Sequence, residues 1–295
     1  MPFSQRSTMD QLSYWNEFER VKEISRGQGI CNNGIYLIRR RRDDARFVLK
    51  SVGISEIAEA EKEALSYLRS HDSIVKLIDA FVAPTRPQTM AFIMEYCDYG
   101  SLHSLINRIN RHNYRLPEHF IWHAFCSLSC GLAYMHYGIT DYRSSRPAHW
   151  RRIVHRDIRP ANILLKSDRH HRYPRVLIAD FGLAHMSGLT YHPQFNGERE
   201  RFSGRGDVWM LGCAMVDLIL GTSGMTPIPP ELGQDCRDCW APSGEISSGL
   251  NLALEACLTI DNKKRVSSKD LMLGLVEMRQ GERPKRERLP EWIWG

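Results

Sequence analysis

Two short fragments near the middle of the chain constrain its fold more than any other feature. Residues 153–165 read Ile-Val-His-Arg-Asp-Ile-Arg-Pro-Ala-Asn-Ile-Leu-Leu, and residues 176–182 read Val-Leu-Ile-Ala-Asp-Phe-Gly. The first pattern predicts a Pro-containing loop followed by a short strand. The second predicts a strand that ends at a carboxylate, next to a glycine that lets the chain turn.

The polar residues of these fragments suit one kind of chemistry. Two strands would bring Asp157, Asn162 and Asp180 to one place. The side-chain oxygens of Asn162 and Asp180 suit Mg²⁺, which keeps several waters and takes phosphate oxygens rather than a full protein cage. Asp157 is then left to accept a proton from an incoming hydroxyl group.

The two fragments together resemble the eukaryotic protein kinase family, whose catalytic loop H-R-D-x-x-x-x-N is followed by D-F-G. All fixed positions of both patterns are matched here. The resemblance implies an α+β, two-lobed protein kinase fold. Its N-lobe, about residues 20–96, would hold a small five-stranded antiparallel sheet and one helix, and its C-lobe, about residues 97–280, would be mainly helical. Residues 1–19 would form a lead-in, and residues 281–295 a charged tail.

The expected phosphate loop lies near the start of the domain. Gly27 and Gly29 would let backbone amides approach phosphate oxygens closely. The family has a third glycine nearby, whereas this chain has Asn32 and Asn33, so the cover over the phosphates is expected to be looser. The resemblance makes Ile35 an apolar roof over adenine.

The resemblance gives Lys50, at the end of the run from Phe47, the role of pairing with the α- and β-phosphates. Val48 would lie above adenine in place of a smaller alanine. Residues 55–69 have helical spacing, and their predicted buried stripe is listed as Ile57, Ala60, Ala64, Leu65 and Leu68. On this helix Glu61 is the expected ion-pair partner of Lys50, with Glu63 as the alternative.

Residues 74–81 and 91–96 are predicted to be the last two strands of the sheet. The segment that follows resembles the family hinge, in which backbone groups of Glu95 and Cys97 would hydrogen-bond adenine and Met94 would be the gatekeeper. Leu164 is expected to contact the nucleotide as well. Helical patterns follow at residues 101–108, 117–137, 248–258 and 268–279.

In the catalytic loop the cation two residues after the aspartate is Arg159, where serine/threonine kinases have lysine. A guanidinium can reach the γ-phosphate, although the two cations are not equivalent. Pro160 favours Ser/Thr specificity over Tyr specificity. The polar connection at residues 138–152 is longer than in most of the family, a feature similar to fungal relatives of the NIMA-related kinases. Asp207 opens a buried helix and is expected to hold the backbone of the catalytic loop.

The segment after D-F-G departs most from the family. Pro193 and Gln194 stand where the family has A-P-E, and about ten residues of the activation loop are missing by comparison. Gln194 would hydrogen-bond Arg265 without charge assistance. Possible phosphosites are Ser187, Thr190 and Tyr191, with Arg156 as the partner of such a phosphate.

Composition limits the location and the partners. A formal charge of +6 is too diffuse to indicate nucleic-acid binding, and the longest apolar stretch is too short to span a membrane. The basic turn from Arg39 to Arg42 is expected to be exposed and partly neutralised by Asp43 and Asp44. The eight cysteines are scattered, and Cys236 and Cys239 have metal spacing without a second pair nearby. A reduced cytoplasmic or nuclear location and a monomer are expected.

The function that these patterns predict is transfer of the γ-phosphoryl group of ATP, with Mg²⁺, to Ser or Thr of a protein substrate. Asp157, Lys50, Glu61, Arg159, Asn162 and Asp180 would carry it. The first alternative is a catalytically impaired nucleotide-binding scaffold, suggested by the shortened activation segment. The second is a small-molecule phosphotransferase of related fold, which the H-R-D pattern and the helix at Asp207 disfavour.

Overall fold

The computed structural model divides the chain into two compact units. The first comprises Met1–Ser70 and Val75–Tyr96, and the second comprises His71–Ile74 and Cys97–Gly295. Within them the structure describes residues 15–25, 32–68, 71–85, 87–141, 143–188, 203–222, 246–280 and 289–294. Gly27, Gly29, Thr190, Tyr191, Pro193 and Gln194 lie outside the described residues.

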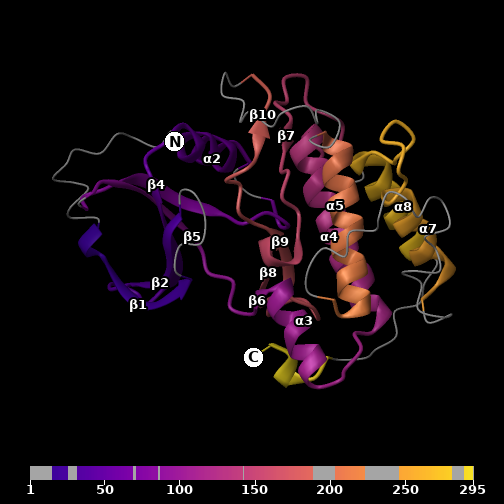
Figure 1. The fold of residues 1–295 in the computed structure, drawn as a ribbon, viewed down its shortest axis with the longest axis horizontal. Helices are drawn as coiled ribbons and strands as arrows, with labels where there is room; N and C mark the ends of the chain where they lie inside the picture. The colour runs from indigo at the N-terminus through magenta and orange to yellow at the C-terminus, as the bar shows by residue number, and fades with distance from the viewer. Residues whose placement is uncertain are drawn as a thin grey trace. The chain divides into compact units, whose positions relative to one another are not determined.

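The first unit is built on one antiparallel sheet of five strands, as predicted (Figure 1). Its strands in spatial order are β1 (Phe18–Ser25), β2 (Asn32–Arg40), β3 (Arg46–Gly53), β5 (Thr89–Glu95) and β4 (Leu77–Ala83). One face carries a buried apolar cluster that includes Ile38, Leu49 and Ile93. These three residues are each at most 2% exposed, and they lie on the neighbouring strands β2, β3 and β5.

The basic turn between β2 and β3 is exposed and paired with acidic side chains. Arg40 contacts Asp43 through two nitrogen–oxygen pairs at 2.9 and 2.6 Å. Arg39 lies 3.0 Å from Asp44, and both Arg39 and Arg41 form ion pairs with Glu19 on β1. The expectation that Asp43 and Asp44 offset this charge is therefore confirmed, and Glu19 adds to it.

The helix of the first unit, α2 (Glu56–Leu68), has a different buried face from the one predicted. Ala64, Leu65 and Leu68 are buried as expected, but Ala58 and Glu61 complete the face, while Ile57 and Ala60 are only half-buried. The predicted stripe was misplaced at Ile57 and Ala60, whose place on the buried face is taken by Ala58. Glu61 occupies an inward position, as its expected pairing with Lys50 requires.

The fourth strand begins later than the predicted residue 74. Ile74 forms an isolated parallel bridge with Ile178 inside the second unit, and the Ile178 amide donates to the Ser73 carbonyl at 2.8 Å. Ile74 is therefore bound to the second unit, and regular β4 pairing starts at Leu77. Apolar periodicity does not distinguish these two uses of an extended segment.

The second unit is mainly helical. Its helices are α3 (Leu102–Arg111), α4 (Glu118–Tyr137), α5 (Gly204–Leu220), α7 (Ser248–Cys257) and α8 (Ser268–Gln280). In Figure 1, α4 lies alongside α5 and α8, and most of its residues are buried. A helix that is apolar on nearly all sides is expected in the middle of such a bundle. None of the helices in the described part of the chain combines the length and the apolar character needed to cross a membrane.

Short strands of the second unit hold the two constraining fragments. β8 (Ile163–Lys166) pairs with β9 (Arg175–Ile178) and with β6 (Gly100–Ser101), while β7 (Ile153–Val154) pairs with β10 (His185–Met186). A single 3₁₀ turn, η1 (Pro160–Asn162), lies between β7 and β8. The first fragment is thus a loop flanked by strands, and the second begins within β9 and continues past its end to Gly182.

The end of the chain docks on α3. Residues Glu291–Trp294 form the 3₁₀ helix η3, drawn in yellow near the C-terminus in Figure 1. Its Ile293 side chain is completely buried. Trp294 stacks on Tyr99 with ring centroids 4.8 Å apart, and Trp292 stacks on His112 at 4.1 Å. The two tryptophans therefore attach this segment to the second unit through ring contacts.

Candidate active site

A buried ion pair joins β3 to α2 in the first unit. The Lys50 Nζ atom lies 2.7 Å and 2.9 Å from the two carboxylate oxygens of Glu61, and the two residues are only 7% and 3% exposed. Glu61, not Glu63, is thus the partner of Lys50. Removing two charges from water costs several kcal/mol per ion, which their attraction repays only with good geometry. Such a pair is weak evidence for stability and marks a candidate functional position.

The second group of predicted residues lies on the loop between β7 and β8. Asn162 donates from Nδ2 to the Asp157 carbonyl oxygen at 2.9 Å and to its carboxylate Oδ2 at 2.6 Å. The Asn162 amide in turn donates to the Arg159 carbonyl at 2.9 Å, which closes the 3₁₀ turn. The side-chain nitrogen of Asn162 therefore fixes the Asp157 side chain. The side-chain oxygen of Asn162, Oδ1, takes no part in these bonds to Asp157.

Burial raises the pKa of the Asp157 carboxyl above its usual value, although the hydrogen bond from Asn162 opposes this shift. The charge of Arg159 lowers the same pKa, and the charge of Asp180 raises it. Asp157, Arg159 and Asp180 are therefore close enough to act on one another. A carboxylate with a raised pKa is a better proton acceptor than an ordinary surface aspartate.

Asp180 stands at the exposed end of the β9 segment with a left-handed backbone, φ 64°. Arg156, next to Asp157, has φ 73°. This region is uncommon for residues other than glycine and costs of order 1–3 kcal/mol at each position. Strain of this kind at two neighbouring segments is an observed outlier that points to function.

His155 ties the two fragments together. Its Nδ1 accepts the Asp157 amide at 3.2 Å, and its Nε2 contacts the Ala179 carbonyl at 3.1 Å, which makes Nε2 the donor. The ring lies edge-on to Phe181 with centroids 4.9 Å apart. Complete burial lowers the pKa of His155, so the ring stays neutral. Sequence reasoning gave His155 no role, although its place in the H-R-D pattern was the available signal.

Asp207, at the start of α5, holds the backbone of this loop, as predicted. Its carboxylate accepts the His155 amide at 2.7 Å and the Arg156 amide at 2.8 Å. It also contacts His136 Nε2 at 2.9 Å, and His136 Nδ1 lies 2.7 Å from the Ser268 hydroxyl on α8. The chain from Ser268 to His136 to Asp207 was not predicted, because it joins side chains from three helices.

The residues expected around adenine divide between the units. In the first unit, Ile35 lies opposite Lys50, and Val48 lies opposite Met94. The Glu95 amide donates to the Lys76 carbonyl at 3.0 Å. In the second unit, Cys97 is buried and Leu164 is half-buried on β8. The adenine contacts of these residues stay predictions.

The segment after D-F-G is described only as far as residue 188. Ser187 is exposed, and its amide donates to the Arg152 carbonyl at 2.8 Å. Arg265, the expected partner of Gln194, donates to the carbonyls of Thr259, Ile260 and Arg205 at 2.9, 3.2 and 2.9 Å. The proposed bond between Gln194 and Arg265 lies outside the described residues, and the three phosphosites remain predictions.

Asn162 and Asp180 fit the role of magnesium ligands by their chemistry. One offers an amide oxygen and the other an exposed carboxylate, and the amide of Ala179, next to Asp180, donates to the Asn162 carbonyl at 2.9 Å. Mg²⁺ takes few protein ligands, so a pair is sufficient. Elsewhere in the described part of the chain, no cluster of three or more His, Cys, Asp or Glu side chains could hold a metal ion. Cys236 and Cys239 are outside that part.

Comparison with known proteins agrees with the geometry. The model of a family described as protein kinase domain matches residues 18–274. The chain is similar to serine/threonine-protein kinase Nek1 of Toxoplasma gondii, with 27% identity over 289 residues that cover 88% of this chain and 17% of the relative. It is similar to serine/threonine-protein kinase Nek2 of Homo sapiens, with 30% identity over 223 residues, 68% of this chain and 46% of the relative.

The chain is also similar to a protein kinase from a yeast. The G2-specific protein kinase fin1 of Schizosaccharomyces pombe is 25% identical over 269 residues, which cover 81% of this chain and 36% of that protein. The chain therefore spans less than half of the length of these three relatives.

Proposed function

Because this chain belongs to the protein kinase domain family, we propose that it transfers the γ-phosphoryl group of ATP to serine or threonine hydroxyls of protein substrates. The observation that carries the proposal is the buried pair of Lys50 and Glu61. Well-packed apolar residues would stabilise this position at least as well. A buried lysine held by a carboxylate is explained by a need to bind phosphate there.

The proton acceptor of the proposed reaction is Asp157. Its carboxylate is oriented by Asn162 and has a pKa raised by burial, so it can take the proton of the acceptor hydroxyl as that oxygen attacks the γ-phosphorus. The bond from the γ-phosphorus to the β,γ-bridging oxygen breaks, and ADP leaves with both electrons of that bond. The proton thus ends on Asp157, and the phosphoryl group ends on the substrate oxygen.

The other residues place and neutralise phosphate groups. Lys50 would hold the α- and β-phosphates, with Glu61 fixing its direction. Arg159, whose charge already lowers the pKa of Asp157, is exposed beside it and would bind the γ-phosphate. Mg²⁺, when bound to Asn162 and Asp180, would supply positive charge at the β- and γ-phosphates. Catalysis of this kind depends mostly on placement and electrostatics.

Serine/threonine specificity rests on two supports. The relatives that the chain resembles are named as serine/threonine kinases, and Pro160 follows the cation of the catalytic loop.

The test is transfer of radiolabelled phosphate from Mg·ATP to a mixed protein substrate. We expect Asp157→Ala and Lys50→Met each to reduce the rate by about 10²-fold or more, the usual contribution of a general base or a phosphate-binding cation. Lys76→Met is the matched control, because Lys76 is an exposed lysine of the same unit. Transferred phosphate should be found on Ser or Thr.

The scaffold alternative predicts a different result. The wild-type protein would not transfer phosphate, yet Mg·ATP would still raise its melting temperature by binding to the folded state. Lys50→Met would remove that rise. This outcome would overturn the proposed activity while leaving nucleotide binding in place.

A further inference from the structure

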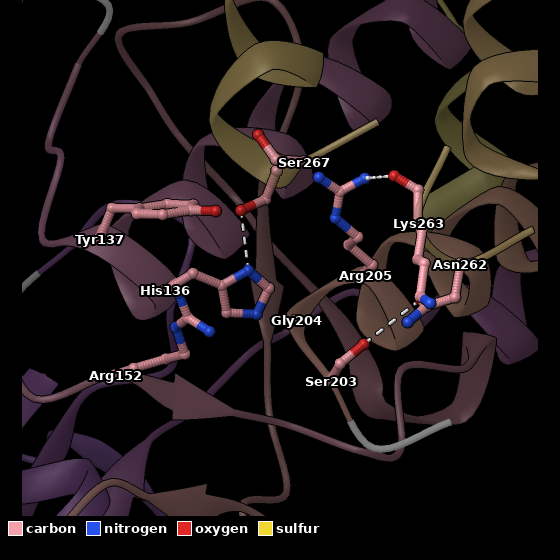
Figure 2. Close-up of a pocket in the computed structure, with 10 residues that line it drawn as sticks. His136, Tyr137, Arg152, Ser203, Gly204, Arg205, Asn262, Lys263 and Ser267 are labelled. Atoms are coloured by element: carbon pink, nitrogen blue, oxygen red, sulfur yellow. Dashed lines mark hydrogen bonds between the residues drawn. The ribbon is translucent and has the colours of Figure 1, made fainter. Parts of the chain in front are cut away.

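A second candidate site lies in the helical unit, where α4 ends and α5 and α8 begin. It is a cavity of about 470 Å³, within the usual size range of small-ligand pockets. In Figure 2, Arg152 lies on one side and Arg205 and Lys263 lie on the other, with His136 between them. None of the residues that the kinase proposal uses lines this cavity.

The cavity wall is basic. Arg152, Arg205 and Lys263 line it, and no carboxylate is found among the described residues that do. The Arg205 guanidinium donates to the Lys263 carbonyl at 3.0 Å and to the Arg265 carbonyl, and Arg152 lies over the Tyr137 ring at 5.6 Å. Carbonyls and a ring orient these cations but carry no net charge to cancel theirs.

The nearest acidic side chains are used elsewhere. Asp207 accepts the two backbone amides of the catalytic loop. Asp270 accepts the Ser267 hydroxyl at 2.6 Å, and Asp261 accepts the Lys263 amide at 2.9 Å. Ser267 and Lys263 belong to the cavity wall, so the bonds of Asp270 and Asp261 lie at its edge, but none of the three carboxylates itself lines the cavity. The excess of positive charge among the lining side chains favours an anionic ligand.

The remaining lining groups are polar. Ser203, Ser267 and Ser268 bring hydroxyls, which are bonded to Asn262, Asp270 and His136 in this structure, and Asn262 also brings an amide. Ser203 is the N-cap of α5, and Ser268 is the first residue of α8. The first amides of a helix have no acceptor within it, and its dipole favours negative charge at that end. Two helix starts thus add to the attraction of the three cations.

We propose that this basic pocket binds a phosphoryl dianion, supplied either as free phosphate or as a phosphorylated side chain. Two guanidinium groups offer paired N–H donors that match phosphate oxygens, and Lys263 adds a third positive charge. The volume exceeds that of one phosphate group, so the rest of a phosphorylated residue also fits. The site is distinct from the proposed nucleotide site, because its lining comes from different residues.

The test measures binding and not catalysis. Inorganic phosphate and O-phospho-L-threonine are titrated into the protein by calorimetry at constant ionic strength, with L-threonine as the reference. We expect both phosphoryl compounds to bind and L-threonine not to bind. Tighter binding of inorganic phosphate would identify free phosphate as the ligand, and tighter binding of O-phospho-L-threonine would identify a phosphorylated side chain. Both results support the proposal.

Variants locate the binding. Lys263→Gln and Arg152→Gln should each weaken phosphate binding roughly fivefold, because each removes one charge-assisted contact. Both side chains are exposed, so these changes are expected to leave the fold intact, which circular dichroism verifies. The matched control is Lys264→Gln, whose side chain is an exposed neighbour outside the cavity wall.

The Lys50→Met variant separates this site from the nucleotide site. It should bind phosphate as the wild type does. Equal phosphate affinity in the wild type, Lys263→Gln and Arg152→Gln would overturn the proposal, as would loss of binding in Lys50→Met or no binding to the wild type. None of these readings depends on whether the protein transfers phosphate.

Discussion

At the scale of single residues, the most unusual feature is the left-handed backbone of Arg156 and Asp180. Arg156 is next to Asp157 in the chain, and Asp180 is itself one of the proposed functional carboxylates. The Arg156 amide is held by Asp207, and the Ala179 carbonyl before Asp180 is held by His155. The strain is therefore maintained by buried hydrogen bonds that come from other elements. No pattern in the sequence predicts it, since neither residue type requires this conformation.

Asp157→Asn is expected to stabilise the protein while abolishing phosphoryl transfer. The pKa of Asp157 is raised in the folded state, chiefly by burial, so the charged carboxylate opposes folding at neutral pH. An asparagine is neutral and keeps an oxygen that can accept the bond from Asn162. We expect the melting temperature at pH 7 to rise by about 1–2 °C, the effect of a fraction of a kcal/mol in a domain of this size.

The pH dependence follows from the sign of the shift. As pH falls through the raised pKa, the wild-type carboxyl takes up a proton and loses its cost, so the advantage of Asp157→Asn should disappear in acid. Melting curves of both proteins from pH 7 to pH 4 measure this. Asp141→Asn is the control, because the Arg143 amide lowers the pKa of that exposed carboxyl and its replacement should give no gain. If the melting temperature of Asp157→Asn exceeds that of the wild type by more at pH 4 than at pH 7, the prediction is wrong.

At the scale of elements, the long periodic segments were predictable from the sequence. The predicted helices at residues 117–137 and 268–279 agree with α4 and α8 to within one residue at either end. The errors occur where a tertiary contact overrides the pattern. Ile74 pairs with Ile178 and so leaves the strand, and on α2 Ala58 is buried in place of the predicted Ile57 and Ala60.

The candidate site was predictable to the same degree. Motif spacing singled out Lys50, Asp157, Asn162 and Asp180 as candidates, because the family patterns mark these positions along the chain. The hydrogen bonds that position these side chains could not be predicted from the sequence. Ser268 lies 132 residues from His136, and their contact exists only because α8 packs on α4. A sequence motif shows which side chains touch a ligand. The hydrogen bonds that position those side chains come from residues far away in the chain, which only the packed structure brings together.

The element η3 gives a prediction of its own. Ile293 is completely buried against α3, and the Arg108 guanidinium donates to its carbonyl at 2.7 Å. Ile293→Ala should lower the free energy of unfolding by about 2–4 kcal/mol, as expected for a large-to-small change in a core. Urea denaturation followed by far-UV circular dichroism measures it.

Leu252→Ala is the matched control for this prediction, because Leu252 is more than half exposed. Its loss should cost less than about 0.5 kcal/mol. If Ile293→Ala is no more destabilising than Leu252→Ala, the chain end does not contribute to the core of the second unit. That result would mean that the docking of η3 adds nothing measurable to the free energy of unfolding.

At the scale of the whole molecule, the helical unit is expected to unfold as one cooperative body. Its core joins α4, α5 and α7, which carry the buried thiols of Cys126, Cys213 and Cys257. At Gly212 a side chain would lie 2.8 Å from the Cys257 Cβ atom, so glycine is what allows α5 and α7 to approach so closely. Opening one of these helices must therefore disturb the others.

Alkylation of the three cysteines tests this cooperativity. Burial raises the pKa of Cys213 to about 12 and raises those of Cys126 and Cys257 as well, so the native thiols are both shielded and protonated at pH 8. We expect pulse labelling with N-ethylmaleimide, read by mass spectrometry, to leave all three unmodified in the native protein. In increasing urea, all three should become reactive with one common midpoint. If Cys257 reacts at a clearly lower urea concentration than Cys126, α7 opens on its own, and the packing at Gly212 does not couple it to α5.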